Sequence, residues 1–150
     1  MPFPQAGVSI SEQVLEHMRL ACHSLPGMAE VARAREDLYS ERDAPSINIK
    51  GEDEQTRPSG DKLDDSELTA TLDVYVRAEQ TQVWETLADA IAVKAHARLT
   101  AYASWPLGFA SIRKIGKRFG GYAAELTPGL LSVRYAIRFV NLARALDEVP

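Results

Sequence analysis

Residues 67–77, ELTATLDVYVR, form the most regular stretch of the chain and decide how its neighbours are interpreted. Apolar and polar side chains alternate along it, and this period of two is typical of a strand with one buried face. The buried face is expected to carry Leu68, Ala70, Leu72, Val74 and Val76. The opposite face is expected to carry Thr69, Thr71, Asp73, Tyr75 and Arg77. Such a strand predicts a sheet whose second face meets water or a partner protein.

The chain just before this strand changes character from apolar to acidic. Ile47 and Ile49 alternate with polar residues and predict a short strand over 46–50, with Pro45 at its entry. Residues 51–66 are polar and acidic, contain a proline and two glycines, and are too long for a plain hairpin turn. We therefore expect a long, mobile acidic loop that becomes ordered against a neighbouring subunit or another partner.

The acids of this predicted loop do not have the spacing of a metal site. A calcium-binding loop needs alternating oxygen ligands, a glycine at its sixth place and a glutamate at its twelfth. Leu63 stands two places after Asp61, where a ligand is needed, and no glycine stands at the sixth place. A charge run that meets solvent or a partner is the preferred interpretation. The candidate interface acids are Glu52, Asp53, Glu54, Asp61, Asp64 and Asp65.

Two amphipathic helices are expected. Ser9 and Glu12 form a capping box at the start of a helix over 9–25, which the Pro-Gly pair that follows ends. A second helix over 81–99, opened by Thr81, carries a continuous apolar stripe. Residues 28–40 fit both a helical and an alternating pattern, and the residues alone leave that choice open.

The last third of the chain alternates again in two segments. Residues 109–119 predict a strand whose phase slips near Arg113 and Lys114, as a β-bulge causes. Residues 130–140 predict a further strand with strong alternation. Turns or breaks are expected at 104–108, 120–121 and 127–129, and residues 141–150 form a C-terminal tail.

The predicted order of elements favours the α+β class. We expect a mostly antiparallel sheet of four to five strands with two main helices packed on one face. With 150 residues, the chain is expected to form a single domain over 1–150 that folds without a disulfide or metal. Its composition, 45% apolar and 25% charged, is ordinary for a soluble protein. The net charge of −4 gives no general reason to bind nucleic acid.

No segment has the pattern of a targeting or membrane-spanning sequence. The first residues lack the basic and apolar regions of a signal peptide. No stretch approaches the roughly 18 apolar residues of a membrane helix. The single cysteine, Cys22, excludes an internal disulfide. We expect a cytosolic protein, unless it leaves the cell within a larger assembly.

No catalytic constellation is evident in the sequence. His17, His23 and His96 lack the spacing of metal ligands, and Cys22 falls on the apolar stripe of its helix, as a small buried hydrophobe does. Gly116–Lys117 lacks the other residues of a phosphate-binding loop. The sequence therefore predicts a structural or interaction protein, not an enzyme, with no cofactor and no metal.

A basic cluster remains, and it comprises Arg113, Lys114, Lys117 and Arg118. Such a cluster could contact nucleic-acid phosphates. Because the whole chain is acidic, we prefer a solvated strand face or one half of a complementary protein interface.

Six segments in a fixed order carry a resemblance to a known family. They are the N-terminal helix, VARAREDLYSERDAPSINIK at 31–50, LTATLDVYVRA at 68–78, the helix VWETLADAIAVKAHARL at 83–99, and the two final strands, FASIRKIGKRF at 109–119 and LLSVRYAIRFV at 130–140. Over roughly residues 8–140, this pattern resembles the tail terminator (tail completion, minor tail protein U-like) family of long-tailed bacteriophages. The resemblance implies that 28–35 form a strand.

The resemblance also implies a structural role in the virion. Proteins of this family form a ring, commonly of six subunits, that caps the head-proximal end of the tail tube, stops its polymerisation and offers a surface to the head. The implied partners are other copies of the chain, the tail tube protein and the head completion or neck proteins. DNA only passes through the ring, and no membrane is involved. The implied location is the tail of the virion and, during assembly, the host cytoplasm.

A ring needs a head-to-tail interface that closes, and half-polar or edge strands can supply it by pairing between subunits. A specific contact should bury more than roughly 1,000 Å². One candidate surface is the strand face carrying Tyr75, Arg77, Arg134 and Arg138. Another is the basic cluster of one subunit opposite the acidic loop of its neighbour. The net charge of −4 also suggests that the lining of the ring's channel is acidic and repels DNA.

Two other functions stay open from the sequence. One is a different ring or connector component of a phage neck or of a tail-like secretion system, which only its position in the particle would separate. The other is a small α+β enzyme or ligand-binding domain whose site the sequence does not reveal. A stable monomer with a ligand-sized pocket that forms no rings would favour this last reading.

Overall fold

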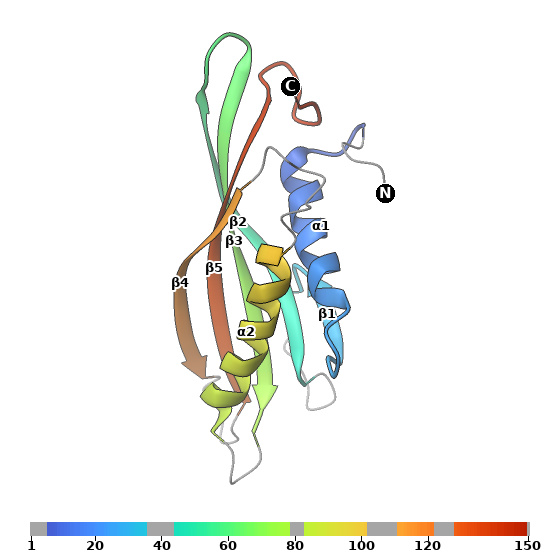
Figure 1. Ribbon diagram of the computed structural model, residues 1–150, viewed down its shortest axis with the longest axis vertical. Helices are drawn as coiled ribbons and strands as arrows, with labels where there is room; N and C mark the ends of the chain where they lie inside the picture. Colours follow the sequence, from blue (N-terminus) through green and yellow to red (C-terminus); the bar gives the residue numbers. More distant parts are fainter. Residues whose placement is uncertain (1–5, 36–43, 79–82, 102–110, 122–127, 150) are drawn as a thin grey trace.

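The computed structural model describes residues 6–35, 44–78, 83–101, 111–121 and 128–149, and these residues form two helices and one sheet (Figure 1). The elements are α1 (Ile10–His23), β1 (Glu30–Arg33), β2 (Ser46–Pro58), β3 (Leu63–Arg77), α2 (Trp84–Ala101), β4 (Ser111–Gly121) and β5 (Pro128–Leu142). The predicted α+β class is confirmed.

The five strands form one sheet in the order β1-β2-β3-β5-β4. The pairs β2–β3, β3–β5 and β4–β5 are antiparallel, whereas β1 pairs parallel to β2. The sheet is therefore mostly antiparallel, as predicted. β3, which contains the alternating stretch 67–77, lies at its centre and pairs with β5 over its whole length, from Leu63 opposite Leu142 to Arg77 opposite Pro128.

Both helices pack against the same face of the sheet, as predicted (Figure 1). The alternation of β3 and β5 places one row of side chains from each strand under the helices. The strands contribute the fully buried Leu72, Val74, Leu131 and Ile137, among others. The helices contribute Val14 and Met18 from α1 and Ala88, Ala95 and Leu99 from α2. The small alanines let α2 lie close to the sheet.

The boundaries of α1 agree with the predicted signals, whereas α2 runs from Trp84 to Ala101 and not over the predicted 81–99. The Ser9 hydroxyl accepts a hydrogen bond from the backbone N–H of Glu12, which caps α1. Gly27 has a φ of 80°, a conformation that glycine adopts easily just past the end of a helix. Thr81 and the predicted turn at 104–108 lie outside the described residues. Neither described helix is long and apolar enough to cross a membrane.

The open choice at residues 28–40 is settled as a strand over Glu30–Arg33. β1 is short and lies at one edge, where its four residues pair with Ser46–Ile49 of β2. The Arg33 guanidinium holds it against α1, because its nitrogens lie 2.9 Å from the Glu12 carboxylate and 3.4 Å from that of Glu16. Residues 36–40 lie outside the described part.

The prediction of a long, mobile acidic loop over 51–66 is wrong. β2 continues to Pro58, β3 begins at Leu63, and only residues 59–62 turn between them. The two strands stay in register up to Pro58 opposite Asp64, and the Ser59 N–H donates to the Leu63 carbonyl at 2.9 Å. The segment is thus a hairpin that extends beyond both helices (Figure 1).

Smaller predictions about β4 and β5 are partly corrected. The phase slip is confirmed as a register shift between Lys114 and Gly116. Gly120 and Gly121 do not end the strand but belong to it. The predicted turn at 127–129 is wrong for Pro128 and Gly129, which begin β5. Gly129 is needed for close packing, because a Cβ there would lie 2.0 Å from the Trp84 ring.

The predicted tail starts later than residue 141, because β5 runs to Leu142. The following residues fold back between the turn of the hairpin and the start of α1. The Ala143 N–H donates to the Lys62 carbonyl at 2.9 Å, and the Ile10 N–H donates to the Leu146 carbonyl at 2.8 Å. This segment therefore ties the hairpin to the helix.

Candidate assembly interface

The sheet face opposite the helices carries charged side chains that pair across strands. Arg134 of β5 contacts Glu52 of β2 at 3.0 Å. Arg138 of β5 contacts Asp65 of β3 at 2.6 Å, and Arg57 of β2 lies 3.8 Å from the same carboxylate. Two arginines predicted to face a partner thus meet acids of their own chain.

The middle of this face is closed to solvent in the free chain. Tyr75 is only 1% exposed and lies level with Ser46 and Leu130, so the prediction that it faces water or a partner is wrong. The Asp73 carboxylate accepts a hydrogen bond from the Ser132 hydroxyl at 2.6 Å and lies 3.3 Å from the Lys50 ammonium. Arg77 is the last residue of β3 and is half-buried.

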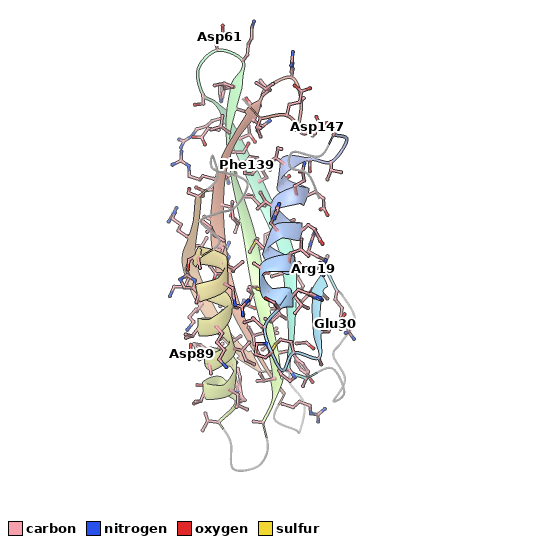
Figure 2. All side chains as sticks on the ribbon, turned by 45° about the vertical axis from the view of Figure 1, so that its right-hand side comes forward. Arg19, Glu30, Asp61, Asp89, Phe139 and Asp147 are labelled. Carbon is pink, nitrogen blue, oxygen red and sulfur yellow. The ribbon has the colours of Figure 1, made fainter. Side chains whose placement is uncertain are left out.

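The candidate acids are distributed along the hairpin. Glu52 sits at a register shift of β2 and points to Arg134, whereas Asp53 and Glu54 are exposed. Asp61 lies in the turn, at the far end of the hairpin from both helices (Figure 2). Asp64 stands opposite Asn141 of β5. The acids therefore line a hairpin that projects beyond both helices, and they do not gather at one point.

The basic cluster is divided between the two faces of β4. Arg113 stands opposite Ala136 and Arg118 opposite Ser132, which places both on the open face. Lys117 lies on the helix side and contacts Asp89 of α2. Lys114 stands opposite Tyr135, whose side chain also faces the helices. The cluster consequently surrounds the outer edge of β4.

Arg113 and Lys117 have weak or local partners. The Arg113 guanidinium lies 4.0 Å from the Glu67 carboxylate, both exposed, and such a pair contributes little in water. Lys114 and Arg118 have no ion-pair partner among the residues that the structure describes. These two cations are therefore available to an external anion.

Besides the outer edge of the short β1, two longer segments of strand edge are left unpaired within the described chain. β1 covers β2 only up to Ile49, so the edge of β2 from Gly51 to Pro58 has no neighbouring strand there. β4 pairs with β5 alone, and its outer edge is open from Ser111 to Gly121. Unpaired edges present backbone N–H and C=O groups to which another chain can add.

The sequence analysis missed three exposed apolar side chains around β4. Phe119 is 49% exposed, Ile115 40% and Val93 of α2 60%. Val93 comes one helical turn after Asp89, which binds Lys117, so it lies on the side of α2 that faces β4. An alternating strand predicts that an apolar residue points inward, and no sequence signal reveals its exposure.

A hollow on the hairpin is polar and open. It has a volume of about 230 Å³ on the hairpin and is lined by Gln55, Thr56, Arg57, Asp65, Glu67 and Arg138. Its charges are engaged in the ion pairs described above. Within the described ranges, no group of three His, Cys, Asp or Glu side chains could hold a metal ion.

Burial keeps the Cys22 thiol and the Tyr135 hydroxyl protonated. Burial raises the pKa of the Cys22 thiol to about 12, so no thiolate is present near neutral pH. Burial also raises the pKa of Tyr135, whose hydroxyl lies 2.9 Å from His96 Nδ1 under α2. These contacts stabilise packing between α2 and β5. The predictions of no enzymatic activity and no cofactor stay predictions.

Comparison with protein-family models and with curated proteins finds no match to this chain. The strongest features of the described residues are the acidic hairpin, the open strand edges and the basic, partly apolar margin of β4.

Proposed function

We propose that this chain is a structural subunit that forms a ring, of six copies by the family resemblance, at the head-proximal end of a bacteriophage tail tube. The ring stops tube growth and offers a surface to the head completion or neck proteins. The order of helices and strands supports the proposal, since the segments that carry the resemblance form α1, β1, β2, β3, α2, β4 and β5 in sequence.

The observation that carries the proposal is a sheet with unpaired edges on both sides. A stable monomer usually protects its edges with short strands, prolines or covering segments. Here β4 and the distal part of β2 are long, and no described element covers them. A head-to-tail assembly uses two different edges of each subunit and can close into a ring.

A tail terminator lies at the joint between head and tail, so imaging of the particle can test the proposal. Particles from a phage that encodes this chain with a short C-terminal tag should bind a gold-labelled antibody at the head–tail joint. Loss of the chain should leave tails of uncontrolled length that do not join heads. Label at the distal tail tip, or normal tail lengths without the chain, would contradict the proposal.

The same images separate the alternative ring components. A label on the head side of the joint, together with tails of normal length, would indicate a neck or connector protein. The hollow on the described part of the hairpin is polar and open, and the charged side chains that line it form ion pairs, so it gives no specific support to a small-molecule enzyme.

A further inference from the structure

We infer that β4 of one copy pairs with residues 52–58 of β2 in a second copy, which joins the two sheets head to tail. The inference rests on the proposed function, because it names the contact by which the ring closes. The occupant of each open edge is thus another copy of this chain.

The backbone supplies the first argument. Among the described strands, β4 has no neighbour on its outer edge, whereas β1 pairs with β2 at Ser46–Ile49 and leaves only the hairpin part of that edge free. Adding a strand satisfies the exposed N–H and C=O groups of both edges with main-chain hydrogen bonds. The short β1 therefore restricts the contact to the acidic hairpin.

Charge then selects which edges meet. β4 carries the cations Arg113, Lys114, Lys117 and Arg118 and no acid. Residues 52–58 carry the acids Glu52, Asp53 and Glu54 with one cation, Arg57. Pairing β4 with β4, or hairpin with hairpin, brings like charges together, and this disfavours a symmetric dimer. The complementary contact joins two different surfaces, as a ring requires.

The free charges lie where this contact needs them. Glu52 and Lys117 already have partners within their own chain. Asp53 and Glu54 on the hairpin, and Lys114 and Arg118 on β4, form no ion pair within the described ranges. Two acids and two bases are thus left to attract each other between copies.

Strand direction agrees with a ring. β2 runs opposite to β3, β3 opposite to β5, and β5 opposite to β4, so β2 and β4 run in opposite directions. A rotation about an axis along the strands keeps these directions, and the new pair is antiparallel. Pro58 is level with Asp64, whereas Ser111 is level only with Glu67. Full pairing therefore staggers adjacent copies, as tilted strands are staggered in closed barrels.

The apolar margin of β4 adds affinity to this contact. Phe119, Ile115 and Val93 are exposed beside the strand that would receive the hairpin. A strand added there covers part of their surface, and burial of apolar surface favours association. The contact thus combines backbone pairing, opposite charge and apolar burial.

Charge exchange between copies tests the inference. The hairpin variant is Asp53→Lys with Glu54→Lys, and the β4 variant is Lys114→Glu with Arg118→Glu. In sedimentation velocity at low salt, the wild-type chain should associate as its concentration rises. Each variant alone should associate at least about tenfold more weakly, because like charges then meet. An equal mixture of the two variants should regain association. The unchanged hairpin of one variant then meets the unchanged β4 of the other, and the lysine-bearing hairpin meets the glutamate-bearing β4.

A matched control carries the same change of charge away from both edges. Lys94 and Arg144 are exposed on α2 and in the C-terminal turn, so Lys94→Glu with Arg144→Glu should associate like the wild type. If either double variant fails to fold by circular dichroism, Glu54→Lys and Arg118→Glu replace them singly. Association of either edge variant at wild-type strength, or a mixture that does not recover, would overturn the inference.

A wild-type chain that stays monomeric up to about 1 mM would overturn it as well. The proposed function is tested by a separate experiment, the position of the gold-labelled antibody in the particle. A label at the head–tail joint with failed charge exchange removes this contact but keeps the function. Successful charge exchange with the label elsewhere keeps the contact and removes the function.

Discussion

The ring of Trp84 lies directly on the backbone of Gly129, and this contact sets how closely α2 approaches the sheet. A Cβ at residue 129 would lie 2.0 Å from Trp84 Cε3 and 2.2 Å from Cδ2. The indole also packs at a tilt on Phe119, with 6.3 Å between the ring centroids. Glycine is therefore required here by packing and not by a turn.

Gly129→Ala should destabilise the fold by about 1–3 kcal/mol, because the indole must move out of a well-packed site. Gly120→Ala is the matched control on the neighbouring strand, since its nearest contact would be the Leu130 carbonyl oxygen at an ordinary 3.9 Å. Urea unfolding of both variants measures the difference. Equal midpoints for the two would show that Trp84 does not need the space at Gly129.

Glu16 links α1 to β1 through charge and makes this part of the fold sensitive to acid. The hydrogen bond from Arg19 at 2.5 Å, followed by the charges of Arg19 and Arg33, lowers the pKa of its carboxyl below 4.5. A carboxyl with a lowered folded-state pKa stabilises the protein above its unfolded value. That stability is lost as the pH falls through the folded-state value.

Glu16→Gln should therefore lower the urea midpoint at pH 7 more than at an acidic pH below the folded-state pKa of Glu16, where the wild-type carboxyl is also protonated. Asp147→Asn, whose carboxylate accepts a single exposed backbone hydrogen bond from Gly7, provides a comparison at the other end of α1. A Glu16→Gln deficit that is the same at both pH values would mean that packing, and not charge, explains it.

At the scale of elements, the hairpin is the largest departure from the sequence prediction. Residues 52–58 have no apolar alternation, so their pattern gave no indication of a strand. Their order depends on partners distant in sequence, such as Arg138 for Asp65 and Arg134 for Glu52, which are separated by 73 and 82 residues. Local patterns cannot show such pairs, because they exist only after β5 has joined β3.

Asn141 of β5 connects the hairpin, near its turn end, to the C-terminal turn. The residue is 4% exposed, and its Nδ2 donates to the carbonyls of Leu142 at 3.0 Å and Ala145 at 3.2 Å. Its Oδ1 accepts from the Ser66 hydroxyl at 3.3 Å, and Ser66 in turn lies 2.9 Å from the Thr56 hydroxyl. This row joins β2, β3 and β5.

Asn141→Ala should cost about 1–3 kcal/mol, because it leaves buried polar groups without their partner. Arg144→Ala, three residues later, removes only an exposed ion pair with Glu148 and should cost less than about 1 kcal/mol. Thermal unfolding compares the two variants. If Arg144→Ala destabilises the chain as much as Asn141→Ala does, the buried row does not hold the hairpin.

At the scale of the whole molecule, periodicity located both helices and the strands with an apolar face, because burial imposes a repeat on the sequence. The alternation in 67–77 and 130–140 thus gave β3 and β5. The same rule cannot show which strands are neighbours, which edges stay open, or that Tyr75 is covered. The sequence identified the candidate charged residues, but it could not show which side chains of the same chain they pair with, because those pairs form only in the folded protein.

The open edges predict a pattern of amide hydrogen exchange across the whole sheet. In dilute protein, amides of β3 should exchange slowest, since β3 has a paired neighbour on both sides. The outward amides of 52–58 and 111–121 should exchange much faster. Raising the protein concentration should slow exchange in these two segments and leave α1 unchanged, because only the edges gain hydrogen-bond partners.

β1 offers the informative comparison, as its outer edge is also unpaired among the described residues. Protection gained at Glu30–Arg33 instead of at β4 would place the contact between copies on the wrong side of the sheet for the proposed head-to-tail pairing.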